Sequence, residues 1–297
     1  MPGLKRSDQP TRRGALASLA AAALAAPAAA RAAKAPLRIT LPALPLGALE
    51  HTLYFPQLLR LALTRTSDDG PFEIRHFSEP MSSLRQMAEL RRRGAINVMW
   101  DGTSDQREAE LLPVRIPLLR ELNDYRVFLI REEDHARFGR LRGLDELRRL
   151  QAGAGENWPS VDVLRHNGLP VVTTASYGSL FPMLRAGRFD YLPRGVHEVW
   201  AEQRSQASHR LAIEQGIFLH YPVPFYFFVS RDDTALAARI ERGLTAALAD
   251  GSFDKLFRGI PSFQLSLDEI AAGRRRVFEL QMPPPGPAPA ASAPTPV

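Results

Sequence analysis

The sequence contains no cysteine, and only three of its 297 residues are lysine. Without cysteine the chain forms no disulfide framework, no thiolate zinc site, no catalytic thiol and no lipid-modified cysteine at a mature N-terminus. Its seven histidines show neither His-x-x-x-His nor His-Glu-x-x-His spacing, so we predict no metal site and no cofactor. The Gly-x-Ser-x-Gly pattern of a serine nucleophile is missing as well. These absences exclude catalysis that depends on the cysteine, metal-binding and serine-nucleophile motifs named above.

The positive charge of the chain is concentrated at its N-terminus. The formal net charge is +6, which on its own suggests a nucleic-acid or membrane-surface binder. Residues 1–32 contain five of the 38 basic residues and one of the 32 acidic residues, so the rest of the chain carries a net charge of +2. The arginines of that remainder are scattered rather than gathered in one stripe. We therefore predict no nucleic-acid partner.

The first 32 residues have the pattern of an export signal. Arg12-Arg13 precede a short Ala/Leu run, and small residues follow up to Ala32. The paired arginines resemble a twin-arginine signal, although Ala15 stands where Phe is usual. We expect cleavage near Ala32, a periplasmic location and no stable membrane insertion afterwards. An uncleaved anchor helix is the alternative, but the run is short and rich in alanine.

Between the two ends, strand and helix patterns alternate. Apolar β patterns such as Leu37–Leu41, Tyr125–Arg131 and Phe225–Ser230 are separated by segments with apolar residues at helical spacing. Such alternation predicts an α/β fold with mainly parallel sheets that are flanked by helices. A Pro/Ala-rich segment over 283–297 has no apolar period, and we expect it to be a disordered tail.

In parallel α/β sheets, ligands bind beyond the carboxyl ends of the strands. Strand-end segments are therefore where we look for a site. Residues there that carry useful chemistry are Trp100, Asp101, Thr103, Asn157, Trp158, Tyr177 and Arg194.

The order of the motifs resembles a known family. Asp105-Gln106-Arg107 follows a strand-end turn, a Gly-Arg-x-Asp motif occupies 187–190, and a long helix ends in Ala-Asp-Gly-Ser-Phe over 249–253. This arrangement resembles periplasmic solute-binding proteins of the amino-acid-binding type (type II fold, extracellular family 3), over about residues 37–282. The resemblance implies a monomer with two α/β lobes and two hinge crossings between them. Lobe 1 spans 37–116 plus 225–282, lobe 2 spans 121–222, and the crossings lie near 117–122 and 221–226.

The resemblance also implies roles for individual residues. Arg107 matches the family's arginine that binds the ligand carboxylate, and a planar guanidinium suits that task. Near the position of the family's ammonium-binding aspartate, however, the sequence has Arg194-Gly195. A cleft with Arg107 and Arg194 favours an anionic ligand over an ordinary amino acid, with Asp101 as a compensating charge. In lobe 2, Trp158 is expected to cover one face of the ligand and Asn157 to hydrogen-bond it.

The expected function is capture of a small anionic or carboxylate-bearing ligand by hinge closure, for a membrane permease or a sensor. Two alternatives stay open at the level of sequence. One is a regulatory or partner protein that has this fold and has lost small-molecule binding. The other is a periplasmic dehydratase-like enzyme, for which Glu156 and Asp101 are the only acid or base candidates in the cleft.

Overall fold

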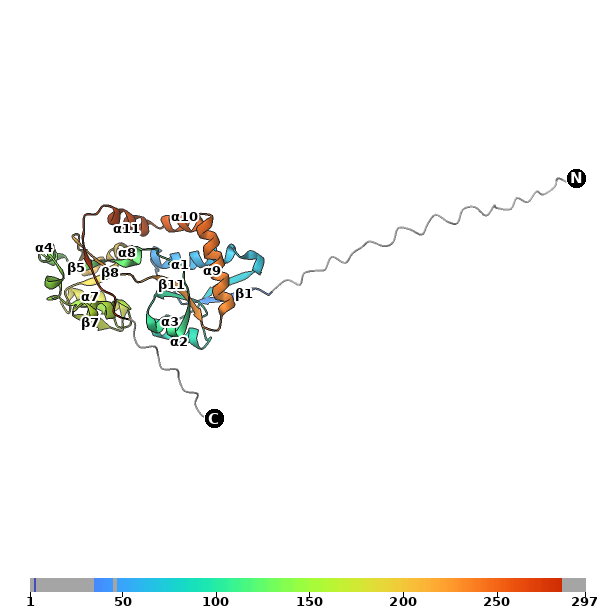
Figure 1. Cartoon of the computed structure of the whole chain (residues 1–297), viewed down its shortest axis with the longest axis horizontal. Helices are drawn as coiled ribbons and strands as arrows, with labels where there is room; N and C mark the ends of the chain where they lie inside the picture. The colour runs from blue at the N-terminus through green and yellow to red at the C-terminus, as the bar shows by residue number, and fades with distance from the viewer. Residues whose placement is uncertain (1–2, 4–34, 45–46, 285–297) are drawn as a thin grey trace, which may run out of the picture. The chain divides into compact units, whose positions relative to one another are not determined.

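The computed structural model describes residue 3 and residues 35–44 and 47–284 (Figure 1). The export signal expected over 1–32 and the tail expected over 283–297 fall almost wholly outside these residues, so both stay predictions. Across the described ranges, no helix combines the length and the apolar character that a bilayer crossing needs.

The first and last parts of the chain build two small sheets together. In one, β1 (Leu37–Leu41) pairs in parallel with β2 (Phe72–His76). In the other, β11 (Phe225–Ser230) lies between β3 (Met99–Gly102) and β4 (Leu111–Val114) and runs antiparallel to both. Strand β11 therefore brings a distant part of the sequence back beside the first hundred residues.

The middle of the chain builds two further sheets. The larger has the order β12-β10-β5-β8, and β9 also pairs with β5. The smaller pairs β6 with β7 in parallel. The bounds of these strands are β5 Tyr125–Arg131, β6 Ala152–Gly155, β7 Val171–Thr174, β8 Leu192–Gly195, β9 Leu211–Ile213, β10 Ile217–His220 and β12 Arg276–Glu279.

The expected α/β class is confirmed, with one difference in strand direction. The sheets are mixed rather than mainly parallel, because β5 and β11 run antiparallel to every strand that they pair with. Both are long apolar strands that directly follow a segment connecting the two sets of sheets. Their direction is set by that crossing and not by a βαβ connection.

Eleven α-helices pack around the sheets in the described part of the chain. Their bounds are α1 Glu50–Thr64, α2 Ser83–Arg91, α3 Asp105–Glu110, α4 His135–Gly139, α5 Leu144–Leu147, α6 Ser160–His166, α7 Leu180–Arg185, α8 Val196–Ser205, α9 Thr234–Ala249, α10 Ser252–Arg258 and α11 Pro261–Ala271. Figure 1 shows α1 in blue and α9 in orange, which lie in contact although they are far apart in sequence. Gly243 of α9 permits this approach, since a Cβ there would fall 2.0 Å from the carbonyl oxygen of Ala62.

The end of the fold departs from the expected boundary. We expect a helix over 267–280 within lobe 1, but α11 ends at Ala271 and Gly273 adopts a φ of +60°. Strand β12 follows and pairs in parallel with β10, a strand of the expected lobe 2. A left-handed glycine stops the helix and lets the chain extend to the other sheet.

Two features tie the two sets of sheets together. Helix α8 packs against α1 and α11 in one continuous apolar cluster, and Ser266 Oγ donates a 2.8 Å hydrogen bond to the carbonyl of Val196. The two crossing segments are also bonded to each other: Asn123 Nδ2 donates to the carbonyl of Val223 at 2.6 Å. These contacts surround the region between the sheets, where the candidate site lies.

Candidate functional site

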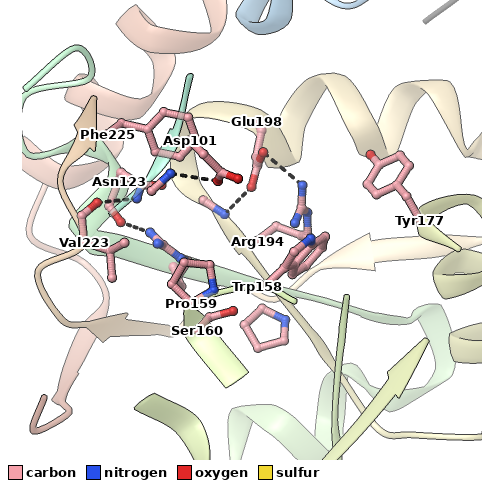
Figure 2. Close-up of a pocket in the computed structure, with 14 residues that line it drawn as sticks. Asp101, Asn123, Trp158, Pro159, Ser160, Tyr177, Arg194, Glu198, Val223 and Phe225 are labelled. Atoms are coloured by element: carbon pink, nitrogen blue, oxygen red, sulfur yellow. Dashed lines mark hydrogen bonds and ion pairs between the residues drawn. The ribbon is translucent and has the colours of Figure 1, made fainter. Parts of the chain in front are cut away.

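A pocket of about 190 Å³ lies where the two sets of sheets meet the crossing segments (Figure 2). Strand β3, both crossings, β5, the loop before α6, the short 3-10 helix at Tyr177–Ser179, β8 and α8 all contribute to its wall. The lining residues are Asp101, Gly102, Asn123, Arg126, Trp158, Pro159, Ser160, Tyr177, Pro193, Arg194, Gly195, Glu198, Val223 and Phe225. Both expected lobes and the second expected crossing supply residues to this wall, and Asn123 lies directly after the first crossing.

Four of the eight residues singled out from the sequence line this pocket, namely Asp101, Trp158, Tyr177 and Arg194. Three of the other four have different surroundings. Trp100 stacks on Phe55, with 5.3 Å between ring centroids, and Thr103 donates to Glu108 Oε1 at 2.6 Å. Asn157 is exposed and does not line the pocket. Their assignment as ligand contacts stays a prediction without support from this geometry.

Arg107, the remaining candidate, is buried and its guanidinium is taken up by the protein itself. Nη2 lies 2.6 Å from Asp101 Oδ2 and donates to Ser83 Oγ at 3.0 Å, while Nη1 donates to the carbonyl of Gly102 at 2.6 Å. The local sequence fixes this arrangement, because Ser104 Oγ accepts from the Arg107 backbone N–H and caps α3. Arg107 is not among the residues that line the pocket.

Arg194 has an even denser environment. Its Nε and Nη2 bond both oxygens of Glu202 at 2.7 and 2.6 Å, and Nη2 also lies 2.9 Å from Glu198 Oε2. The guanidinium carbon lies 4.4 Å from the ring centroid of Trp158 and 5.7 Å from that of Tyr177. Burial disfavours the charged form, but the two carboxylates outweigh it and raise the pKa of Arg194. Arg194 is thus a permanent, fully compensated cation.

The carboxylates beside Arg194 come from α8, the helix that starts directly after it. Gly195 precedes the helix, and Glu198 Oε1 accepts a 2.9 Å bond from the Gly195 N–H. A Cβ at position 195 would fall 2.4 Å from the His197 ring, so the turn needs glycine. From the sequence we expected Asp101 as a compensating charge, but no carboxylate near Gly195, where the family has its ammonium-binding aspartate. One helical turn further along, Glu198 and Glu202 supply two.

Arg126 is the pocket cation that the sequence reasoning missed. It lies at the start of β5, is 7% exposed and lines the pocket. Nη1 donates to the carbonyl of Asn123, and the guanidinium carbon lies 4.9 Å from the ring centroid of Tyr221. No carboxylate of the described residues forms an ion pair with it. The feature of the sequence that could have pointed to Arg126 is the presence of an arginine inside the apolar strand pattern of residues 125–131.

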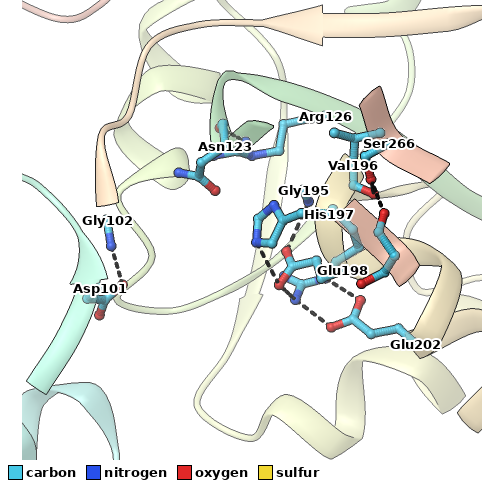
Figure 3. Close-up of polar contacts among 12 residues, drawn as sticks. Asp101, Gly102, Asn123, Arg126, Gly195, Val196, His197, Glu198, Glu202 and Ser266 are labelled. Carbon is cyan, nitrogen blue, oxygen red and sulfur yellow. Dashed lines mark hydrogen bonds and ion pairs between the residues drawn. The ribbon is translucent and has the colours of Figure 1, made fainter. Parts of the chain in front are cut away.

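Two buried histidines lie near the carboxylates that bond Arg194, and Figure 3 shows one of them, His197, beside Glu198. His51 of α1 and His197 of α8 meet edge to face, with ring centroids 6.3 Å apart. Burial, and then the neighbouring His51 and Arg126, lower the pKa of His197 well below its ordinary value. One donor atom each from His51, Glu198 and Glu202 lie within 4.8 Å of one another, which is a possible metal-ligand set. Both carboxylates already bond the Arg194 guanidinium, so the cation among these groups is that side chain.

Comparisons with known proteins show which fold this is. No protein-family model matches the chain, and no curated protein matches it in sequence. Several solved structures do match. An ancestral arginine-binding protein bound to arginine covers 77% of this chain and 99% of its own, with a TM-score of 0.56 and 15% identity. The substrate-binding protein AbpA of an amino acid ABC transporter from Streptococcus pneumoniae, bound to L-arginine, covers 77% and 95%, with a TM-score of 0.53 and 14% identity.

The chain has the fold of these binding proteins. It is the two-lobed α/β fold that the order of motifs led us to expect. An ancestral amino-acid-binding protein described as a precursor of cyclohexadienyl dehydratase also matches, with a TM-score of 0.54 and 13% identity over 76% of this chain and 95% of its own. At such identities the likeness establishes the fold, and the function has to be argued from the pocket.

Proposed function

We propose that this protein binds a small carboxylate-bearing solute in the pocket and that Arg126 is the residue that holds the carboxylate. The observation that carries the proposal is the state of the three buried arginines in this region. Arg107 is paired with Asp101, and Arg194 is paired with Glu202 and Glu198. Arg126 alone of these three lines the pocket without an ion-paired carboxylate; Asp124 interacts with it only at longer range and accepts a bond from the Val223 N–H.

The geometry of Arg126 suits this task. A guanidinium is planar, stays charged when buried and offers parallel N–H donors to a carboxylate. Its Nη1 is engaged by backbone carbonyls, whereas Nε and Nη2 bond no described residue. Bonds to Asn123 and packing on Tyr221 orient the side chain before a ligand arrives. A pre-oriented cation avoids part of the entropy cost of binding.

Arg194 supports the same conclusion by exclusion. Its single positive charge already faces two carboxylates, so this wall of the pocket repels a further anion. A ligand carboxylate is therefore directed to Arg126. The pair of ligand-binding arginines expected from the sequence, Arg107 and Arg194, is replaced in this proposal by one arginine from the expected lobe 2.

In biological terms, the proposal is a periplasmic solute-binding protein that works with a membrane permease or a sensor. The fold, the pocket between the two sets of sheets and the expected export signal over 1–32 support it. Ligand bound to Arg126 would also contact Asp101 and Phe225 from the other side of the pocket, so both expected lobes hold it. Such two-sided contact favours the closed arrangement of the lobes.

A second function is favoured by a specific observation. Both arginines that the sequence placed in the cleft, Arg107 and Arg194, are ion-paired with the chain's own carboxylates. This arrangement also suits a protein that has the fold and has lost small-molecule binding. The dehydratase-like alternative has no comparable structural support, because Glu156 is exposed and outside the pocket wall, and Asp101 is bonded to Arg107.

The two functions are separated by a thermal-shift experiment. The purified protein is heated with a panel of small carboxylic acids and with the matched amides, which have the same shape and no charge. Binding at 100 times the dissociation constant adds about 2.7 kcal/mol to the stability of the folded state. We expect some acids, and none of their amides, to raise the melting temperature. A panel without any shift contradicts the binding proposal and supports the second function.

A further inference from the structure

We propose that Arg194 is a built-in occupant of a cation site in the pocket wall, and that it makes the pocket reject ligands with a cationic group. The part of this inference that concerns ligand specificity rests on the proposed function. The cation site itself is tested with compounds that contain no carboxylate. The claim makes Arg194 a residue that determines specificity.

The surroundings of the Arg194 guanidinium have the chemistry of a binding site for an alkylguanidinium. Two aromatic rings, those of Trp158 and Tyr177, lie 4.4 and 5.7 Å from the guanidinium carbon. Glu202 receives two parallel N–H bonds in the bidentate geometry that guanidinium and carboxylate share. Aromatic faces and carboxylates together are how proteins recognise organic cations. Here one side chain of the same protein fills the site.

Every carboxylate oxygen in this site already has a donor. Glu202 Oε1 bonds Arg194 and, at 2.5 Å, the hydroxyl of Tyr177, while Oε2 bonds Arg194 Nε. Glu198 Oε2 lies against Arg194, and Oε1 accepts from the Gly195 N–H. An external ammonium or guanidinium would have to displace the buried Arg194 side chain to reach these oxygens. The pocket is therefore closed to cationic groups on this wall.

The site is also connected to the pocket. Trp158, Tyr177, Arg194 and Glu198 all line the cavity that we assign to the ligand (Figure 2). Shortening Arg194 would open the site to the cavity and leave Glu202, which is 1% exposed, without its cation. A small alkylguanidinium that enters through the pocket would then restore the missing contacts.

A second buried arginine provides a matched control. Arg275 lies between Glu269 and Glu214, its guanidinium carbon is 5.1 Å from the ring centroid of Phe218, and its side chain is 1% exposed. It has the same partner types as Arg194, but it does not line the pocket. Arg275→Ala therefore reports what loss of a buried, carboxylate-bonded arginine does without an entry path for a ligand.

The experiment compares the melting temperatures of the wild-type protein, Arg194→Ala and Arg275→Ala with and without agmatine or methylguanidinium at low millimolar concentration. We expect both compounds to raise the melting temperature of Arg194→Ala only, with agmatine bound at least tenfold more tightly than by the wild type. Arg194→Gln, which leaves less space, should respond more weakly. Equal rescue of Arg275→Ala, or a folded Arg194→Ala without any response, would overturn the proposal.

Two further readings keep the test independent of folding and of the proposed function. If Arg194→Ala folds only when methylguanidinium is present, the proposal is supported. If neither Arg194 variant folds, the binding of agmatine and of carboxylates by the wild-type protein is the test. A wild-type protein that binds agmatine contradicts the claim, and one that binds carboxylates while refusing agmatine supports it. If the wild type binds no carboxylate but Arg194→Ala binds alkylguanidinium, the proposed function fails and the cation site stands.

Discussion

Arg107 and Asp101 form an ion pair in which Arg107 Nη2 lies 2.6 Å from Asp101 Oδ2. The position at which the family resemblance places a ligand carboxylate is thus filled by a carboxylate of the chain itself. Asp101 also accepts from Ser83 Oγ at 2.7 Å and from the Gly102 N–H at 2.8 Å. The pair is part of a hydrogen-bonded network with Ser83 and Gly102, and we expect it to stabilise the fold.

This expectation is tested with a double-mutant cycle. Asp101→Asn leaves the buried Arg107 guanidinium without its counter-charge, and we expect a loss of about 1–3 kcal/mol in unfolding free energy. Arg107→Gln should lose a similar amount, and the double variant less than the sum of the two. Urea denaturation of the four proteins measures the coupling. Additive losses would show that the two residues do not stabilise each other.

Loss of Arg194 should be costly and should depend on pH. Arg194→Ala leaves Glu202 buried and unpaired, so we expect a loss of about 3–5 kcal/mol at neutral pH. The unpaired carboxyl can escape this penalty by taking up a proton, so the gap to the wild type should narrow as the pH falls from 7 to 4. The double variant Arg194→Ala/Glu202→Gln should regain part of the loss. Unfolding free energies at several pH values check both statements, and a gap that widens in acid would contradict them.

The buried imidazole of His197 should make stability fall in mild acid. Burial lowers the pKa of His197 in the folded state below its value near 6.5 in the unfolded chain. The unfolded state therefore binds a proton first as the pH drops, and stability is lost below about pH 6.5 by up to about 1.4 kcal/mol per pH unit. His197→Phe should flatten this part of the stability profile.

The control for that profile is His166, which lies exposed at the end of α6. His166→Gln should leave the acid limb unchanged. The His197 ring Nδ1 has no hydrogen-bond partner in the described part of the chain, so an apolar replacement removes no bond at that atom. An unchanged acid limb in His197→Phe would show that other groups cause the pH dependence.

Asn123 should matter for both stability and binding, because it joins the two crossings and orients Arg126. Its side-chain N–H donates to Val223, and its backbone carbonyl accepts from Arg126 Nη1. Asn123→Ala leaves the Val223 carbonyl unsatisfied, for which we expect a loss of about 1–3 kcal/mol. The backbone contact to Arg126 remains, so affinity should fall less than in a variant of Arg126. Denaturation and titration of the same variant measure the two effects.

Much of the fold could be predicted from the sequence, because strong apolar patterns set the elements. Strands expected over 37–41, 125–131 and 225–230 have those bounds in the structure. Strands expected over 95–100 and 189–192 are instead shifted along the chain: β3 spans Met99–Gly102 and β8 spans Leu192–Gly195. Backbone pairing with β11 and β5 extends them regardless of the polar side chains of Asp101 and Arg194. Such pairing is set by tertiary structure, which a local pattern does not contain.

The candidate site was only half predictable, and the reason is charge pairing. Arg194, Trp158, Tyr177 and Asp101 were found because they follow strands, and all four line the pocket. The sequence does not say which arginine is neutralised, because the partners of Arg107 and Arg194 are set by how helices and strand ends meet. Arg126 looks like an interruption of an apolar strand until its lack of a carboxylate partner is seen in three dimensions.

The central claim is that Arg126 holds the carboxylate of the ligand. The most direct test is calorimetric titration of the best carboxylate from the thermal-shift panel into the wild type, Arg126→Gln and Arg239→Gln. Arg239 is the control, since it is also 7% exposed and donates to backbone carbonyls, those of Thr66 and Gly70, outside the pocket wall; it differs in that its Nε lies 3.9 Å from Asp69 Oδ2.

Hydrogen bonds to a charged group contribute about 1.5–3 kcal/mol. We therefore expect the Kd to rise roughly 10- to 150-fold in Arg126→Gln and to stay unchanged in Arg239→Gln. A folded Arg126→Gln protein that binds the carboxylate as tightly as the wild type would contradict the account.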